Sequence, residues 1–172
     1  MSNKKQVVIY TDGGCSGNPG AGAYAAILTY TSPSGQYFEK SLTGGFNLTT
    51  NNRMELLAAI TSLDALKEPA DVTLYSDSKY LVDAIEQKWL DGWVKKNWKT
   101  GSKSPVKNID LWKRLIPLLQ KHNVKFSWVK GHAGHDFNER CDALVKETFK
   151  NPNLPDDVEF VKNSDDIQQT LL

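Results

Sequence analysis

The chain opens with KQVVIYTDGG at residues 5–14, the stretch from which the rest of the fold can be worked out. Residues 5–12 are rich in β-branched side chains and end beside a pair of glycines, which is typical of a strand that runs into a turn. Because side chains alternate along a strand, Tyr10 and Asp12 share one face. The stretch therefore predicts a strand that ends on a carboxylate, followed by a glycine-rich loop over Gly13–Gly22.

The same kinds of signal predict the remaining elements. Further strands are expected at residues 22–30, 36–46, 71–76 and 124–129. Helices are expected at residues 52–67, directly after Asp77, and at 137–150. Asn52 and Glu55 resemble a capping box at the start of the first helix. The sequence SPSG at residues 32–35 is typical of a turn, so the first three strands should form an antiparallel meander. Such an order of strands and helices favours an α/β fold with a mixed sheet.

Length and composition place the chain among ordinary globular proteins. It has 172 residues, of which 40% are apolar and 24% charged, enough for one domain with a hydrophobic core. No apolar run approaches the roughly 18 residues that a membrane span needs, and residues 1–5 lead into the first strand without a signal-peptide core. Cys15 and Cys141 are too few for a disulfide framework. We therefore expect a reduced, cytoplasmic protein, a monomer with no membrane partner.

The net charge of +1 conceals an uneven distribution. Residues Lys88–Lys107, here called the basic segment, hold six lysines and one acid, whereas residues 151–172 hold five acids and one lysine. We interpret residues 1–150 as one domain and residues 151–172 as an acidic, flexible tail that is loosely packed. The tail is either a plain solvated extension or a competitor of nucleic acid for the basic segment.

The basic segment mixes lysine with tryptophan. Trp89 and Trp93 are spaced to share one helix face, and Lys95, Lys96 and Lys99 follow. Such mixing suits a nucleic-acid surface, because ammonium groups attract phosphates while rings pack on sugars or bases. Alternatively, the tryptophans are core anchors and the lysines form a solvated face. We expect both to hold in part: the tryptophans fix a protruding helix and the lysines face outward.

Four acids lie at positions where burial of a carboxylate costs free energy unless the carboxylate binds a partner. Asp12 and Asp77 each close a strand, and ligand sites gather at the carboxyl ends of strands in α/β sheets. Glu55 lies at the edge of the apolar stripe of its helix, and Asp142 lies in the first turns of the last helix. Each also has a plainer interpretation as a turn, cap or surface residue. If the acids converge, their mutual repulsion calls for a cation, and oxygen ligands favour Mg²⁺ or Mn²⁺.

Two glycine-containing loops offer further candidates. Backbone amides of Gly13–Gly22 could approach a phosphate or sugar, although the loop lacks both the lysine of a P-loop and the G-x-G-x-x-G spacing. The loop Gly131–His135 follows the last strand, and its His132 suits proton transfer near neutral pH. Zinc held by His132, His135 and Cys141 is the competing interpretation, which the lack of a fourth ligand at typical spacing disfavours.

Five stretches together resemble bacterial type 1 ribonuclease H. They are IYTDGGCSGNPG at 9–20, TTNNRMEL at 49–56, YSDS at 75–78, WVKGHAGH at 128–135 and NERCD at 138–142. The resemblance covers about residues 5–151. It implies an α/β ribonuclease H-like fold, in which a five-stranded mixed sheet with its first three strands antiparallel is flanked by helices. It also implies an endonuclease that cleaves the RNA strand of an RNA/DNA hybrid, leaves 5′-phosphate and 3′-hydroxyl ends, and has little sequence preference.

The resemblance also implies roles for individual residues. The metal-binding, catalytic acids are Asp12, Glu55, Asp77 and Asp142. They would hold two Mg²⁺ ions, or Mn²⁺ as a substitute, which activate a water and stabilise the leaving 3′-oxygen. His132 matches the residue for proton transfer and product release. The implied substrate contacts are Cys15, Asn18, Asn51 and Asn52 for the RNA strand, with Thr50, Trp89, Trp93, Lys95, Lys96 and Lys99 for the DNA strand.

Two positions depart from the family pattern. Lys79 stands where the family often has Gln, so this substrate contact is altered or becomes electrostatic. Leu48 stands where the family often has Arg, which changes part of the expected phosphate pocket.

Two other classes of function compete with the nuclease. A catalytically silent hybrid-binding protein is disfavoured because all four acids and His132 are present. A phosphotransferase or ATPase that holds a nucleotide in Gly13–Gly22 is disfavoured by the missing lysine and by the basic segment.

Overall fold

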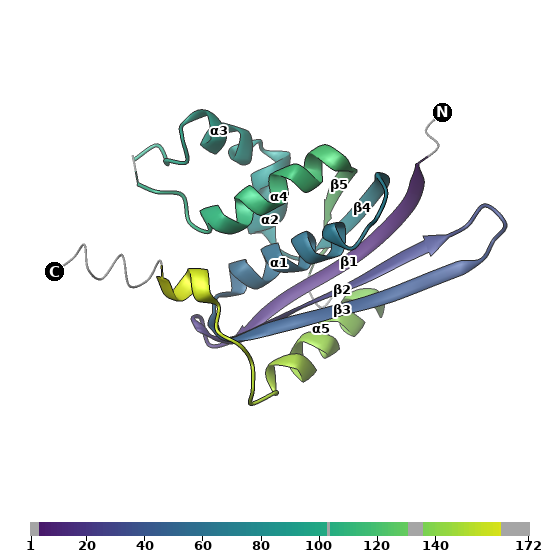
Figure 1. Ribbon diagram of the computed structural model, residues 1–172, viewed down its shortest axis with the longest axis horizontal. Helices are drawn as coiled ribbons and strands as arrows, with labels where there is room; N and C mark the ends of the chain where they lie inside the picture. The colour runs from purple at the N-terminus through teal and green to yellow at the C-terminus, as the bar shows by residue number, and fades with distance from the viewer. Residues whose placement is uncertain (1–3, 103, 131–135, 163–172) are drawn as a thin grey trace.

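The structure is a computed structural model that describes residues 4–102, 104–130 and 136–162 (Figure 1). Its strands are β1 (Lys5–Ser16), β2 (Gly20–Thr31), β3 (Tyr37–Thr49), β4 (Ala70–Ser76) and β5 (Asn123–Trp128). Its helices are α1 (Asn51–Asp64), α2 (Lys79–Glu86), α3 (Trp89–Lys95), α4 (Ile109–Lys121) and α5 (Asp136–Phe149). The strands form a five-stranded sheet in the order β3-β2-β1-β4-β5. The first three strands pair antiparallel, and β4 pairs parallel with both β1 and β5, so the predicted mixed α/β sheet is confirmed.

Helices cover both faces of the sheet (Figure 1). On one face α5 packs against β1 and β2, around the buried Cys141 and Val145. On the other face α1 lies over β1 and β2 and contacts α4, and this side holds the larger core. Every residue from 53 to 60 of α1 is buried, so that helix is enclosed by the sheet on one side and by other helices on the other. None of the helices in the described ranges is long and apolar enough to cross a membrane.

β1 extends further than the sequence predicts, and this changes the expected glycine-rich loop. Pairing with β2 continues to Ser16, opposite Ala21, so the connection is reduced to residues 17–19. Gly13 lies inside the strand, and a Cβ at that position would stand 2.5 Å from the backbone nitrogen of Glu55. The glycine therefore lets α1 lie directly against β1 rather than forming a loop around a phosphate. The alternative of a phosphotransferase or ATPase assumed a nucleotide-binding loop over Gly13–Gly22, and most of that stretch is strand instead.

The start of α1 differs from the predicted capping box. Thr50 is the N-cap, and its hydroxyl oxygen accepts a hydrogen bond from the backbone N–H of Arg53 at 3.3 Å. From the turn between β1 and β2, the Asn18 side chain accepts a hydrogen bond from the N–H of Asn51 at 3.1 Å. Because these two side chains serve the first turn, Glu55 has no capping role and its carboxylate is free to face the sheet.

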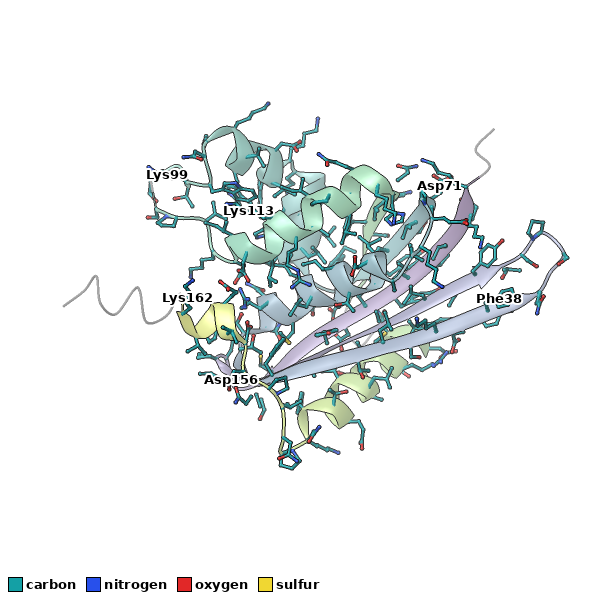
Figure 2. All side chains as sticks on the ribbon, in the orientation of Figure 1. Phe38, Asp71, Lys99, Lys113, Asp156 and Lys162 are labelled. Atoms are coloured by element: carbon teal, nitrogen blue, oxygen red, sulfur yellow. The ribbon has the colours of Figure 1, made fainter. Side chains whose placement is uncertain are left out.

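The C-terminal segment is docked on the domain as far as the structure describes it. The backbone N–H of Asn47 donates to the carbonyl of Pro155 at 2.9 Å, and Asp157 is only 4% exposed. Figure 2 shows Asp156 beside the end of β3, well away from Lys99 of the basic segment. The expectation of a loosely packed tail is therefore wrong for residues 151–162, because a buried carboxylate and a backbone hydrogen bond hold them. Residues 163–172 lie outside the described part of the chain.

Candidate active site

Asp12 in β1 and Asp77, the residue directly after β4, occupy equivalent positions relative to the pairing of these two strands. β1 and β4 run parallel with Tyr10 opposite Tyr75, so each aspartate lies two residues beyond this pair. The hydroxyl of Thr11 donates to the carbonyl of Tyr75 at 2.9 Å and ties the two strands together here. The two carboxylates consequently meet where the parallel pairing of β1 with β4 ends.

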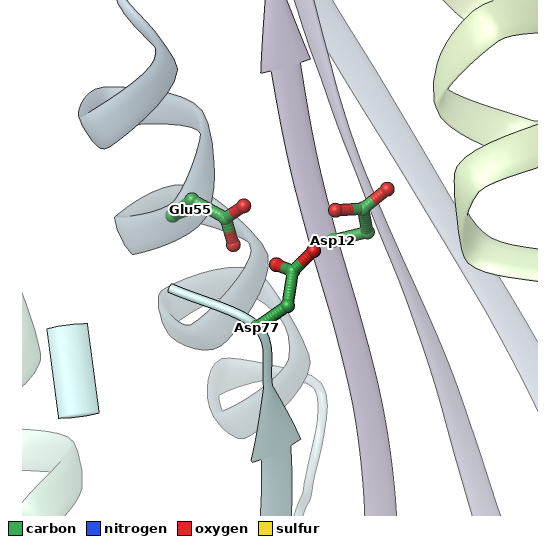
Figure 3. Close-up of side chains that lie close together, drawn as sticks. All are labelled: Asp12, Glu55 and Asp77. Atoms are coloured by element: carbon green, nitrogen blue, oxygen red, sulfur yellow. The ribbon is translucent and has the colours of Figure 1, made fainter. Parts of the chain in front are cut away.

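Glu55 joins them from the helical layer. It extends from α1 toward the two aspartates (Figure 3). One carboxylate oxygen from each of Asp12, Glu55 and Asp77 lies within 4.8 Å of the other two. Glu55 is 3% exposed, and its Oε2 atom has no hydrogen-bond partner among the described residues. A buried carboxylate that has an unpartnered oxygen and lies beside two other acids is an arrangement that a cation would complete.

The proximity of these acids changes their protonation. Burial, followed by the charges of Asp77 and Asp12, raises the pKa of Glu55 well above its ordinary value. Burial, followed by the charges of Asp77 and Asp142, raises the pKa of Asp12 to about 7. The site therefore either takes up protons or binds a cation. Because every converging ligand is a carboxylate oxygen, the donor set fits a hard divalent ion.

Asp142, the fourth predicted acid, lines the same pocket. Its carboxylate forms a 2.8 Å ion pair with Lys146, one turn further along α5. Its charge also reaches Asp12, whose pKa it helps to raise. Lys146, which lines the pocket as well, was missed from the sequence, although its spacing of four residues from Asp142 was a usable signal.

Several of the implied substrate contacts surround the acids. The pocket is lined by Cys15, Asn51, Asn52 and Lys79 in addition to the carboxylates. Asn18 lies next to this group through its hydrogen bond to Asn51. Thr50 is not among the pocket-lining residues, and its hydroxyl caps α1 instead. The start of α1 therefore carries the polar groups that face the pocket mouth.

The basic segment covers α3 and the chain that follows it. Trp93 is partly buried, and its ring meets that of Trp112 edge-on with 5.4 Å between centroids. Trp89 is 42% exposed, so the prediction that it anchors the helix is wrong. The physical reason is that the buried face of α3 runs through Leu90 and Trp93 rather than through Trp89. The three predicted lysines, all exposed, are Lys95, Lys96 and Lys99.

Of the three residues predicted as alternative zinc ligands, the structure describes Cys141, and its surroundings do not favour zinc binding. Cys141 is fully buried beside Ala25 and Ile27, and burial raises the pKa of its thiol to about 12. A zinc ligand must be a thiolate, which this environment disfavours. His132 and His135 lie outside the described residues, so the role of His132 in proton transfer stays a prediction.

A buried ion network behind the site was also missed from the sequence. Arg53, which is 2% exposed, pairs with Asp110 and with Asp157, each at 2.7 Å. The available signal was an arginine placed directly before the apolar run MELLAAI, where an unpaired charge would be costly.

Fold and site together define the class of the protein: a ribonuclease H-like α/β protein with an acidic, cation-suited pocket at the ends of two parallel strands. Among solved structures, LC9-RNase H1, a type 1 RNase H with the type 2 active-site motif, matches with a TM-score of 0.77 and 29% identity, over 86% of this chain and 73% of that one. LC11-RNase H1 in complex with an RNA/DNA hybrid shares the fold, with a TM-score of 0.58 and 22% identity over 84% of this chain and 96% of that one.

Sequence comparison gives the family. The model of the RNase H family matches residues 4–150. Ribonuclease H of Nitratidesulfovibrio vulgaris (strain DP4) is 53% identical over 154 residues, which cover 90% of this chain and 96% of the relative. The chain therefore belongs to the RNase H family, as an enzyme of the bacterial type 1 group.

Proposed function

We propose that the protein is an endonuclease that hydrolyses the RNA strand of RNA/DNA hybrids. The observation that carries this proposal is the carboxylate cluster of Asp12, Glu55 and Asp77, within 4.8 Å, in a chain of the RNase H family. A protein of the same fold, LC11-RNase H1, has been solved in complex with such a hybrid. The unpartnered Oε2 atom of Glu55 supports a cation at the centre of the cluster.

The residues proposed to hold two divalent cations, Mg²⁺ or Mn²⁺, are Asp12, Glu55, Asp77 and Asp142. When bound, such ions supply an activated water and neutralise charge on the phosphate and the leaving oxygen. The protein contributes the fixed placement of the acids. Thr11 holds the strand ends together, Gly13 lets α1 approach β1, and Lys146 keeps the Asp142 carboxylate paired beside the pocket. Preorganised ligands of this kind need little rearrangement when the phosphate arrives.

We further propose that the bond broken joins phosphorus to the 3′-oxygen, so that the products carry 5′-phosphate and 3′-hydroxyl ends. His132 is the candidate for transferring a proton and for assisting product release, since an imidazole can change its protonation near neutral pH.

Recognition of the hybrid is proposed to divide between two surfaces. The residues proposed to meet the RNA strand, whose 2′-hydroxyls distinguish it from DNA, are Cys15, Asn18, Asn51 and Asn52, which lie in or beside the pocket. The exposed lysines of the basic segment are proposed to meet phosphates of the DNA strand. Because phosphate and sugar contacts carry no sequence information, cleavage should show little sequence preference and a strong salt dependence.

The test uses labelled RNA/DNA hybrid, double-stranded RNA and double-stranded DNA, each with and without Mg²⁺. We expect cleavage of the RNA strand of the hybrid alone, and only with the cation. Asp12→Asn should abolish cleavage while hybrid binding survives, because it removes a ligand and leaves the binding surfaces intact. Cleavage without a divalent cation, or near-normal activity of the variant, would contradict the proposal.

A further inference from the structure

A buried acid of the C-terminal segment bridges the end of β3 and the first turn of α1. The Oδ2 atom of Asp157 accepts hydrogen bonds from the Thr49 hydroxyl and from Arg53 Nε, both at 2.7 Å. Its Oδ1 atom accepts from Arg53 Nη2 at 3.1 Å. Thr49 is the last residue of β3, and Arg53 lies in the first turn of α1. One carboxylate thus spans the junction of the two elements.

The bridged residues enclose the polar start of α1. Between Thr49 and Arg53 lie Thr50, Asn51 and Asn52, of which the two asparagines line the pocket. The Asn18 side chain also accepts a hydrogen bond from the N–H of Asn51. The turn is therefore fixed at two points, one in the β1–β2 connection and one in the C-terminal segment.

Two neighbouring contacts place the segment along the end of β3. The carbonyl of Pro155 accepts the backbone N–H of Asn47 at 2.9 Å, and the Asn47 side chain donates to Asp156 at 2.6 Å. These bonds bring Asp157 to the junction in a defined orientation, so the bridge is part of a docked segment rather than a lone ion pair.

Removing this bridge would not leave Arg53 unpaired. Its Nη1 and Nη2 atoms also donate to the two oxygens of Asp110 in α4, at 2.9 and 2.7 Å. The Thr49 contact, in contrast, is made by Asp157 and not by Asp110. The two acids therefore have separable effects: both neutralise Arg53, and only Asp157 connects it to the residue before the helix cap.

We infer that Asp157 is a positioning residue for hybrid binding, which acts by fixing residues 49–53 so that Asn51 and Asn52 face the RNA strand. The inference rests on the proposed function. It assigns a role in substrate binding to a segment beyond residues 4–150, the part that the family model matches. It also predicts that loss of the Asp157 contact weakens hybrid binding, whereas loss of a segment that competes with nucleic acid would strengthen it.

The decisive variant is Asp157→Asn, which keeps the size of the side chain and removes one acceptor oxygen. An amide has a single acceptor oxygen, so it cannot serve Thr49 and both Arg53 nitrogens as the carboxylate does. At a temperature well below unfolding, we expect KM for the hybrid to rise about 3- to 10-fold with kcat within about 2-fold, since binding geometry and not chemistry is disturbed. Asp157→Glu, which keeps two acceptor oxygens, should restore part of the lost affinity.

Two matched controls separate positioning from charge and from stability. Glu159→Gln makes the same charge change at an exposed position of the same segment, and KM should stay unchanged. Asp110→Asn removes the charge of the other acid that pairs with Arg53, and should lower Tm with little change in KM. If Asp157→Asn lowers Tm as Asp110→Asn does and leaves KM unchanged, Asp157 only stabilises the fold and the inference is wrong. A lower KM in Asp157→Asn would instead show that the segment obstructs the hybrid.

A measurement without substrate keeps this inference distinct from the proposed function. Compared with the wild type, Asp157→Asn should increase the rate of amide hydrogen exchange at residues 50–53 more than in β4 or α5. Unchanged exchange at residues 50–53 would show that Asp157 does not fix this turn, whatever the activity of the variant. A wild-type protein that fails to cleave hybrid would overturn the proposed function, while the exchange result would still decide whether Asp157 fixes the turn.

Discussion

Lys79 lies over the ring of Trp128, with its Nζ atom 4.9 Å from the ring centroid. The indole N–H of Trp128 in turn donates to the backbone carbonyl of Asp77 at 3.2 Å. The lysine that departs from the family pattern is therefore held by an aromatic side chain that is tied to the end of β4. Since Lys79 also lines the acidic pocket, its charge is available to a phosphate at a defined place.

Replacing Lys79 with Gln should weaken hybrid binding and lower its salt dependence. Loss of one phosphate contact reduces the slope of log K against log salt concentration by about 1. The measurement is a binding titration at several salt concentrations in the Asp12→Asn background, where no cleavage interferes. Lys125→Gln, an exposed lysine of β5, is the control. An unchanged slope for Lys79→Gln would show that this lysine does not contact a phosphate.

Gly13→Ala should damage both stability and activity. The added Cβ would stand 2.5 Å from the backbone nitrogen of Glu55 and 2.6 Å from the carbonyl carbon of Met54, and backbone atoms cannot move aside alone. Displacing α1 should cost about 2–4 kcal/mol in urea unfolding and move Glu55 from the cluster. Gly92→Ala, where nothing lies within 4 Å of the added atom, should be neutral or slightly stabilising. Wild-type stability in Gly13→Ala would contradict the close approach.

Asp12→Asn should stabilise the cation-free protein at alkaline pH. Because the pKa of Asp12 rises from 3.8 to about 7 on folding, the folded state binds more protons within that window, and the free energy of unfolding falls as pH rises through it. At about pH 8 without divalent cations, the variant should therefore be more stable by roughly 1–3 kcal/mol, after allowance for solvent screening. Chemical denaturation across pH checks this. A difference that is as large at about pH 4 would show that charge is not the cause.

His122→Gln should remove an acid-sensitive contribution to stability. The buried His122 accepts the backbone N–H of Ala70 through Nδ1 at 3.0 Å, and burial, followed by the charge of Lys121, lowers its pKa. The folded state therefore binds fewer protons than the unfolded state below the ordinary value of 6.5, and stability falls as pH decreases through that region. Between about pH 7 and pH 5, Tm should fall by a few degrees more in the wild type than in the variant, whose amide oxygen still accepts from Ala70. Equal slopes would contradict this role.

The strands, helices and site residues that could be predicted are those that depend on residues close together in the sequence. Asp77 could be placed at the end of its strand because the strand-forming run stops at Ser76, but the prediction that Asp12 closes the first strand is wrong, since β1 continues to Ser16. The approach of Glu55 could not be predicted, since it depends on the absent side chain of Gly13 in another layer. Helix α4 was not predicted, and it contains Pro117, a residue that normally ends a helix rather than lying inside one.

Two predictions from the sequence were wrong, one about the C-terminal segment and one about Trp89. Acidic residues after position 151 indicate a solvated extension, yet Asp157 meets Arg53, a residue 104 positions away, in the interior. No local pattern encodes a buried ion pair between such distant residues. At Trp89 the spacing was correct for a helix, but Leu90 competes for the same buried face and excludes it.

The contact between Thr49 and Asp157 also determines how late in synthesis the junction of β3 and α1 can form in full. It joins residues 108 positions apart, and the second of them is translated after all four carboxylates. A chain cut short between Asp142 and Asp157 would contain all four carboxylates and yet lack the bond between Thr49 and Asp157. Premature termination there would therefore release a protein that has all four acids of the pocket but no carboxylate joining the end of β3 to the first turn of α1.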